Sequence, residues 1–145
     1  ALSRECVASL SALAEEKEVR MAVEIPSAPL VISISARALE EVLVNLLENA
    51  IKHSGSGDVV TLTVRASEAG ATFEVRDQGV GIEPSLHRRI FERFFRVDAG
   101  RSRHDGGSGL GLAIVRHLVN RMGGTVEVES ALGQGALFRV VVPAR

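Results

Sequence analysis

The chain of 145 residues contains no tryptophan and no tyrosine, and its five phenylalanines are its only aromatic residues. Proteins that bind single-stranded nucleic acid usually stack the bases on aromatic side chains, so this composition does not favour that class. An excess of charge is also lacking, with 17 lysines and arginines against 18 aspartates and glutamates. General nucleic-acid binders are usually basic, so no nucleic-acid partner is expected.

Cysteine and long apolar runs are scarce as well. Cys6 is the single cysteine, which excludes an intrachain disulfide and a zinc site built from several cysteines. We interpret it as a small buried hydrophobic residue and expect a reducing, cytoplasmic environment. No apolar stretch approaches the roughly 20 residues of a membrane-spanning helix, and no signal-peptide pattern is present. We therefore expect no direct membrane contact, and a start at Ala1 suggests a piece of a longer protein.

The rest of the composition, 46% hydrophobic and 24% charged, is ordinary for a globular protein. A chain of this length usually forms one domain and buries roughly two-thirds of the surface that it exposes when unfolded. No linker, internal repeat or low-complexity run divides it. One domain over residues 1–145 is expected.

The spacing of apolar residues predicts helices over residues 2–19, 36–53 and 108–122, with Ser35 as the N-cap of the second. Short alternating runs predict strands over residues 21–25, 30–34, 59–66, 71–77, 125–130 and 136–142. A shorter helix is expected over residues 83–95, with Pro84 in its first turn. The predicted fold class is α/β: a two-layer α/β sandwich in which three main helices cover one face of a mixed, mostly antiparallel sheet.

The second predicted helix carries an unusual polar stripe. Asn45, Asn49 and Lys52 are spaced i, i+4 and i+7, so they share one helix face. Asparagine is a poor residue for a helix interior because its amide competes for backbone hydrogen bonds, so two in one stripe need a reason. An amide oxygen is a suitable ligand for Mg²⁺, and Lys52 with its neighbour His53 could meet phosphate oxygens. The alternative is a polar helix face that contacts only solvent.

Asp77 follows a predicted strand and begins the run Asp-Gln-Gly-Val-Gly-Ile over residues 77–82. A carboxylate at this point can accept a hydrogen bond from the exocyclic amine of adenine. Gly79 and Gly81 would let the backbone pass close to a base, because they have no Cβ. The spacing is not that of the dinucleotide-binding fingerprint. An aspartate in a glycine turn without a ligand is the alternative.

A second glycine-rich run, Gly-Gly-Ser-Gly-Leu-Gly-Leu over residues 106–112, leads directly into the third predicted helix. Backbone N–H groups at such a start favour phosphate, although the run is not a Walker A loop. Residues 87–105 before it hold six arginines and three acidic residues, which suits a triphosphate. A flexible hinge with a solvated basic face is the alternative. A third glycine pair, Gly133 and Gly135, indicates a hairpin turn before Phe138.

In this order, the motifs resemble the ATP-binding catalytic domain of bacterial two-component sensor histidine kinases, within the superfamily that includes DNA gyrase B, the Hsp90 chaperone and MutL. Residues 45–53 resemble the N box of that family, residues 77–82 the G1 box, residues 91–96 the F box, residues 106–112 the G2 box and residues 133–138 the terminal glycine turn. The resemblance covers at least residues 21–142 and implies a Bergerat-type ATP-binding fold.

The resemblance also implies ATP and Mg²⁺ as cofactors. Asn49 would be the Mg²⁺ ligand with Asn45 supporting it, and Asp77 would read adenine. The implied nucleotide-binding residues are Asn49, Lys52, His53, Asp77, Gly79, Gly81, Ile82, Arg96, Arg101, Gly107, Ser108, Gly109, Leu110, Gly111 and Leu112. Asn45, Lys52 and Arg96 are implied as catalytic, with Arg96 and Arg101 or Arg103 close to the γ-phosphate.

One position bears on the reaction type. ATPases of the superfamily, and related serine kinases, resemble one another in placing a glutamate four residues before the Mg²⁺ asparagine, where it can act as a base. Here that position is Asn45, which cannot. Imidazole needs no comparable activation, because its neutral form already has a lone pair. The resemblance therefore implies a protein-histidine kinase that passes the γ-phosphate to a histidine, for relay to an aspartate of a response regulator.

Family members carry the acceptor histidine on a separate helical dimerisation domain, and no histidine of this chain has that sequence context. The chain is therefore expected to be a monomer that does not phosphorylate itself. Its parent is expected to be a homodimeric, membrane-anchored sensor with this domain in the cytoplasm. Two alternatives stay open: an ATP hydrolase of the same superfamily, and a nucleotide-binding regulatory module without transfer activity.

Overall fold

The computed structural model describes residues 2–25, 35–67, 70–92 and 111–143. Two short helices, α1 (Leu2–Ser9) and α2 (Ser11–Lys17), precede strand β1 (Arg20–Glu24) and the long helix α3 (Ala36–His53). A hairpin of β2 (Val59–Ser67) and β3 (Gly70–Arg76) follows, and then two 3₁₀ turns, η1 (Pro84–Leu86) and η2 (Arg89–Phe91). Helix α4 (Gly111–Arg121) leads into the hairpin of β4 (Thr125–Ser130) and β5 (Ala136–Pro143).

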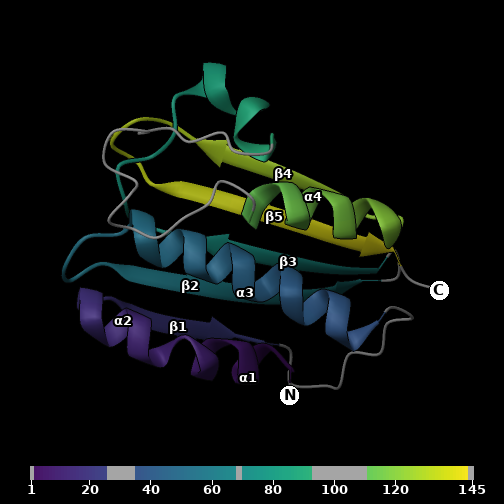
Figure 1. The fold of residues 1–145 in the computed structure, drawn as a ribbon, viewed down its shortest axis with the longest axis horizontal. Coiled ribbons are helices and arrows are strands. Elements are labelled where there is room, and N and C mark those ends of the chain that lie inside the picture. Colours follow the sequence, from purple (N-terminus) through teal and green to yellow (C-terminus); the bar gives the residue numbers. More distant parts are fainter. Residues whose placement is uncertain (1, 26–34, 68–69, 93–110, 144–145) are drawn as a thin grey trace.

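The described strands form one sheet in the order β1-β2-β3-β5-β4 (Figure 1). Strand β1 runs parallel to β2, and the other neighbours are antiparallel, so the sheet is mixed and mostly antiparallel. The helices lie on one face and run roughly along the strands: α3 lies over β2 and β3, α4 lies along β5, and α1 and α2 follow the β1 edge on the same side (Figure 1). This arrangement confirms the predicted two-layer α/β sandwich.

The core lies between α3 and the helix-facing side of the sheet. Seven residues of α3 are buried, and they come at the spacing of one broad apolar stripe: Leu39, Val42, Leu43, Leu46, Leu47, Ala50 and Ile51. Phe138 of β5 is 1% exposed and meets Phe91 edge to face, with ring centroids 6.1 Å apart. This contact attaches the segment after β3 to the same core.

The other face of the sheet is charged. Arg139 of β5 lies opposite Glu74 of β3 and opposite Glu127 of β4. Its guanidinium contacts Glu74 at 2.9 Å, Glu129 at 2.6 Å and Glu127 at 3.7 Å. Such pairing between neighbouring strands suits a sheet face that no described helix covers. Among the described residues, no helix has the length and apolarity needed to cross a membrane.

Helix α3 begins and ends where its sequence predicts. The Ser35 hydroxyl accepts a hydrogen bond from the Ala38 N–H at 3.3 Å, which confirms Ser35 as the N-cap. At the other end the Ser54 hydroxyl donates to the Ala50 carbonyl at 2.7 Å. These two side chains satisfy backbone groups that the helix itself leaves unpaired.

Two helix predictions are wrong in detail. The helix expected over residues 2–19 is divided into α1 and α2 at Leu10, whose N–H bonds to the Val7 carbonyl three residues back. The Ser9 hydroxyl donates to the Cys6 carbonyl at 2.7 Å and so competes with the regular helix bond.

The helix expected over residues 83–95 is also absent as far as Glu92, where the chain forms only η1 and η2. Their bonds are of the 3₁₀ type, such as Leu86 N–H to the Glu83 carbonyl and Glu92 N–H to the Arg89 carbonyl. Ile90 and Phe91 are buried, and Phe91 meets Phe138 of β5, so tertiary packing rather than local periodicity sets the path of this segment. The predicted strand over residues 30–34 lies outside the described residues.

Candidate functional site

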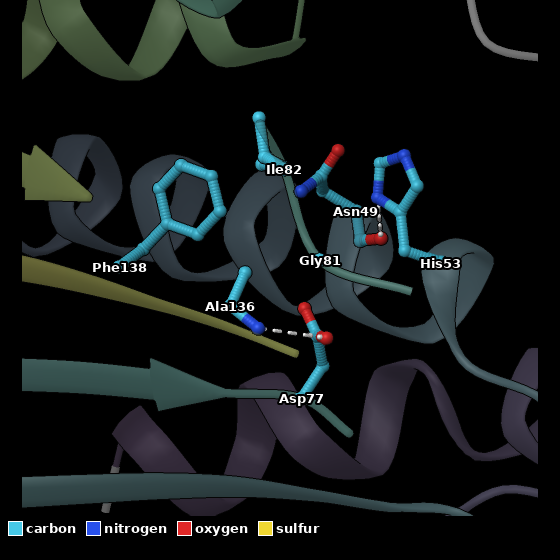
Figure 2. A pocket seen from close by; sticks show the side chains of 7 residues that line it. All are labelled: Asn49, His53, Asp77, Gly81, Ile82, Ala136 and Phe138. Atoms are coloured by element: carbon cyan, nitrogen blue, oxygen red, sulfur yellow. Dashed lines mark hydrogen bonds between the residues drawn. The ribbon is translucent and has the colours of Figure 1, made fainter. Parts of the chain in front are cut away.

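A pocket opens at one end of the sheet, between the last turns of α3, the segment that follows β3 and the start of β5 (Figure 2). Together with the open solvent at its mouth, its empty space is about 190 Å³. Seven residues from these three parts of the chain line it: Asn49, His53, Asp77, Gly81, Ile82, Ala136 and Phe138. Five of them belong to the predicted site, so motifs that lie far apart in the sequence are brought together here.

Asp77 is the buried charge of this pocket. It directly follows β3 and is 3% exposed. One carboxylate oxygen, Oδ1, accepts the N–H groups of Gly79 at 2.9 Å and Ala136 at 3.2 Å. The second oxygen points toward the pocket (Figure 2). A buried carboxylate with one oxygen fully engaged offers the other to a hydrogen-bond donor that enters the pocket.

Burial raises the pKa of the Asp77 carboxyl above 3.8, because desolvation disfavours the charged form. The Gly79 N–H, the nearby His53 and the Ala136 N–H oppose this shift, and Asp58 adds to it. The folded chain therefore holds a carboxylate that is destabilised at neutral pH and that a donor would stabilise.

The raised pKa predicts opposite pH effects on binding and on stability. As the pH falls through this pKa, Asp77 takes up a proton, so affinity for a ligand that donates to its carboxylate should fall. Because the folded pKa lies above the unfolded value, ionised Asp77 lowers stability at neutral pH, and acidification relieves that penalty. Melting curves of wild type and Asp77→Asn should converge as the pH falls. Curves that diverge on acidification would contradict the raised pKa.

The loop after Asp77 is held by the turn between β4 and β5. The Ser130 hydroxyl accepts the Ile82 N–H at 2.7 Å and donates to the Gly135 carbonyl at 2.6 Å. The Gly133 N–H donates to the Val80 carbonyl at 2.7 Å. Gly81 adopts φ +79°, and a Cβ placed on it would overlap the Ala131 carbonyl. The loop and the turn therefore pack too closely at this point for a side chain.

Two further contacts attach the loop to the rest of the fold. A Cβ on Gly79 would overlap the carbonyl of His53 at the end of α3. The Gln78 side chain accepts the N–H of Val59, the first residue of β2, at 2.8 Å. The loop is thus fixed on three sides, by α3, β2 and the β4–β5 turn, and it keeps the Asp77 carboxylate in place.

Asn49 and Asn45 behave differently although they share one face of α3. The Asn49 amide lies between Ile82 and His53 (Figure 2), and its Nδ2 is buried without a hydrogen-bond partner among the described residues. A buried amide without a hydrogen-bond partner lowers the stability of the fold and is rare in native structures. Its place at a pocket therefore suggests a ligand. The Asn45 amide instead donates to the Glu41 carbonyl at 2.8 Å. Its oxygen faces Gly111, where an added Cβ would lie 3.1 Å away.

The two basic residues at the end of α3 are also held by the helix. The Lys52 ammonium lies 2.8 Å from the Glu48 carboxylate. The His53 ring contacts the Asn49 carbonyl through Nδ1 at 2.9 Å, so Nδ1 is the donor and carries the proton. The other ring nitrogen, Nε2, is therefore left for a different partner.

The remaining predicted residues are placed only in part. Lys52 and Asn45 lie on α3 beside the pocket but do not line it, and Gly111 and Leu112 form the start of α4. Six predicted residues lie outside the described part of the chain: Arg96, Arg101, Gly107, Ser108, Gly109 and Leu110. The roles of all these residues stay predictions.

The sequence did not indicate several residues that build the site. Ala136 and Phe138 line the pocket, whereas the sequence placed them in the terminal glycine turn of residues 133–138 and gave them no binding role. Ser130 and Gln78 hold the loop through contacts 48 and 19 residues away in the sequence. Glu48 carried a signal, since its i, i+4 spacing to Lys52 is that of a helical ion pair.

No group of three or more histidine, cysteine, aspartate or glutamate side chains within residues 2–25, 35–67, 70–92 and 111–143 could hold a metal ion. A cation at this pocket would therefore depend on amide oxygens and on oxygens that a ligand brings. Mg²⁺ is often bound in this way, through few protein ligands, several waters and substrate phosphates. The oxygen of the Asn49 amide could serve as such a ligand, and its unpaired Nδ2 would donate to an acceptor that the ligand brings.

Comparison with known proteins gives consistent results. Residues 34–145 match the family described as histidine kinase-, DNA gyrase B- and HSP90-like ATPase. The sensor-like histidine kinase SenX3 of Mycobacterium tuberculosis is 47% identical over 102 residues, which are 70% of this chain and 25% of SenX3. The chain thus spans about a quarter of that relative.

Solved structures of similar fold include a sensor histidine kinase and a full-length protein in complex with AMPPNP. The mycobacterial sensor histidine kinase MprB superposes with a TM-score of 0.80 at 31% identity, covering 97% of this chain and 92% of that one. Full-length ShkA in complex with AMPPNP superposes with a TM-score of 0.84 at 35% identity, covering 99% of this chain and 30% of that one.

Proposed function

The chain belongs to the histidine kinase-, DNA gyrase B- and HSP90-like ATPase family, and from this we propose that it binds Mg·ATP and donates the γ-phosphate to a histidine of its parent protein. Its relatives are sensor histidine kinases. The observation that carries the proposal is the convergence of Asp77 and Asn49 on one pocket. One supplies a buried acceptor and the other an unpaired amide.

Adenine would occupy the pocket at Asp77. Its exocyclic amine donates hydrogen bonds, and the carboxylate oxygen that faces the pocket has no competing donor among the described residues. Ile82 and Phe138 supply apolar walls for the base. The superposition with ShkA covers 99% of the present chain, and ShkA was crystallised with the ATP analogue AMPPNP. This supports a nucleotide in the pocket.

The phosphates would then extend along α3 toward Asn49, His53 and Lys52. Mg²⁺ would be held by the Asn49 amide oxygen with Asn45 nearby, and it would neutralise charge on the phosphates. In the transfer, the bond from the γ-phosphorus to the β–γ bridging oxygen breaks and a bond to an imidazole nitrogen forms, with ADP as the leaving group. The chain contributes positioning and charge, which are the main requirements of phosphoryl transfer.

Asn45 supports histidine over water as the acceptor. An amide cannot remove a proton from water, and the Asn45 Nδ2 is already bonded to the Glu41 carbonyl. A neutral imidazole can attack without a base. We further propose that the histidine lies on a helical dimerisation domain of a homodimeric, membrane-anchored parent. The present chain would be a monomeric unit in the cytoplasm. A response regulator would receive the phosphate.

Removal of the Asn49 amide should abolish the Mg²⁺-dependent part of nucleotide affinity. We expect Asn49→Ala to bind a non-hydrolysable ATP analogue equally with and without Mg²⁺ and to transfer phosphate roughly 100-fold more slowly, since charge neutralisation is lost. Calorimetric titration with and without Mg²⁺ measures the first effect. Asn120→Ala, an exposed asparagine on α4, is the control and should behave as wild type.

The transfer itself is tested with γ-labelled ATP and the dimerisation domain of the same parent. Acid-labile label should appear on that domain when this chain is added, and none on this chain alone. Steady release of phosphate without transfer would indicate a hydrolase instead. Nucleotide binding with neither reaction would indicate a regulatory module.

A further inference from the structure

Lys52, the residue expected to meet phosphate, already has an anionic partner. Its ammonium lies 2.8 Å from Glu48 Oε1, one helical turn earlier. The Lys52 side chain is 21% exposed and that of Glu48 is 40% exposed, so the pair is only partly in solvent. The main chain of Lys52 is also fixed, because the Lys17 ammonium donates a hydrogen bond to the Lys52 carbonyl at 2.7 Å. Any movement of Lys52 toward a ligand is therefore a movement of its side chain.

Helix geometry places Lys52 between two possible partners. Successive residues turn by about 100°, so Glu48 lies about 100° to one side of Asn49 and Lys52 lies about 60° to the same side, one turn further on. The Lys52 side chain thus stands angularly between Glu48 and the residue that faces the pocket. Rotation about its flexible stem would carry the ammonium from the carboxylate toward the pocket.

From this arrangement, and relying on the proposed function, we propose that Glu48 is a positioning residue that competes with the nucleotide phosphates for Lys52. A phosphate that approaches Lys52 must compete with Glu48 for its ammonium. The competition lowers the affinity for the phosphates. It leaves the binding of adenine unchanged, because Asp77 lies in a separate part of the site. When the nucleotide leaves, Glu48 recovers its partner.

The proposal predicts tighter binding when the competitor is removed. Glu48→Gln should bind a non-hydrolysable ATP analogue roughly fivefold more tightly than wild type at low ionic strength, because the carboxylate that competes for Lys52 is lost. Affinity for adenosine, which has no phosphate, should not change. A general effect on folding would alter both ligands alike, so this difference separates positioning from structure.

Two further variants make the test specific. Glu40→Gln removes the same charge from α3 on the side opposite Asn49 and should leave both affinities unchanged. Lys52→Gln should weaken binding of the analogue. In the double variant the gain from Glu48→Gln should be lost, because no ammonium remains to compete for. Melting curves of all variants confirm that they are folded.

Three results would overturn the inference: no gain in Glu48→Gln, an equal gain for adenosine, or a gain that persists without Lys52. These outcomes leave the proposed function intact when wild type binds the analogue and Asp77→Asn does not. If wild type binds no nucleotide, both the proposed function and the inference fail.

Discussion

Asp77→Asn is expected to weaken binding of an ATP analogue by at least about 100-fold, or about 2.7 kcal/mol. The reason is that one oxygen of this side chain already accepts two N–H groups, from Gly79 and Ala136. An asparagine that keeps these bonds presents its NH₂ group to the pocket, where adenine also presents a donor. The flipped amide presents its oxygen to the base but sets its NH₂ against the two backbone N–H groups. Neither orientation satisfies all the donors.

The same variant should not be less stable than wild type. Burial raises the pKa of Asp77, so its ionised form lowers the stability of the folded chain at neutral pH. A neutral amide of the same shape removes this penalty and can still accept the Gly79 and Ala136 N–H groups. We therefore expect an unchanged or higher melting temperature together with loss of binding. This combination distinguishes a defect of recognition from a defect of folding.

Asp58→Asn is the matched control. Asp58 is the other carboxylate that influences Asp77, and its own side chain accepts the Gly55 N–H at 2.7 Å in the neighbouring loop. This variant changes the net charge equally but leaves the pocket intact, so calorimetry should give an affinity close to that of wild type. Full binding by Asp77→Asn would mean that the base does not lie at Asp77. Equal loss in both variants would assign the effect to net charge.

Elements with strong local signals could be predicted from the sequence. Helix α3 has a serine cap at Ser35, a complete apolar stripe and a glycine-rich exit, and its bounds agree with the prediction. Strand β4 also begins and ends as expected, because Gly123 and Gly124 precede it and a glycine turn follows. Each of these signals lies within a few residues of the structure that it specifies.

Other features depend on contacts that no short stretch of sequence contains. The 3₁₀ turns between Pro84 and Phe91 stand where a helix is predicted, and Ile90 and Phe91 are both buried in the core, where Phe91 meets Phe138. The support of Asp77 by the β4–β5 turn depends on Ser130, which resembles any other strand-end serine until the fold is known. Periodicity predicts elements, but it does not say which turn lies against which loop.

The close approach of that loop and turn leads to the second large effect. Gly81 and Gly133 have nearly the same positive backbone φ, +79° and +80°. A Cβ at Gly133 would meet nothing within 4 Å, whereas one at Gly81 would overlap the Ala131 carbonyl. Both glycines therefore carry the cost of a positive φ for any other residue, and they differ in the space around them.

We expect Gly81→Ala to lower the free energy of unfolding by about 3 kcal/mol or more, from backbone strain together with steric overlap. Gly133→Ala should lose about 1 kcal/mol, from strain alone. Denaturant unfolding measures both changes. Since Gly81 belongs to the loop that begins at Asp77, its variant should also bind the ATP analogue more weakly, while Gly133→Ala binds it normally. Equal effects on stability would mean that the loop can move away from Ala131, and the pocket would then be held less firmly than its contacts indicate.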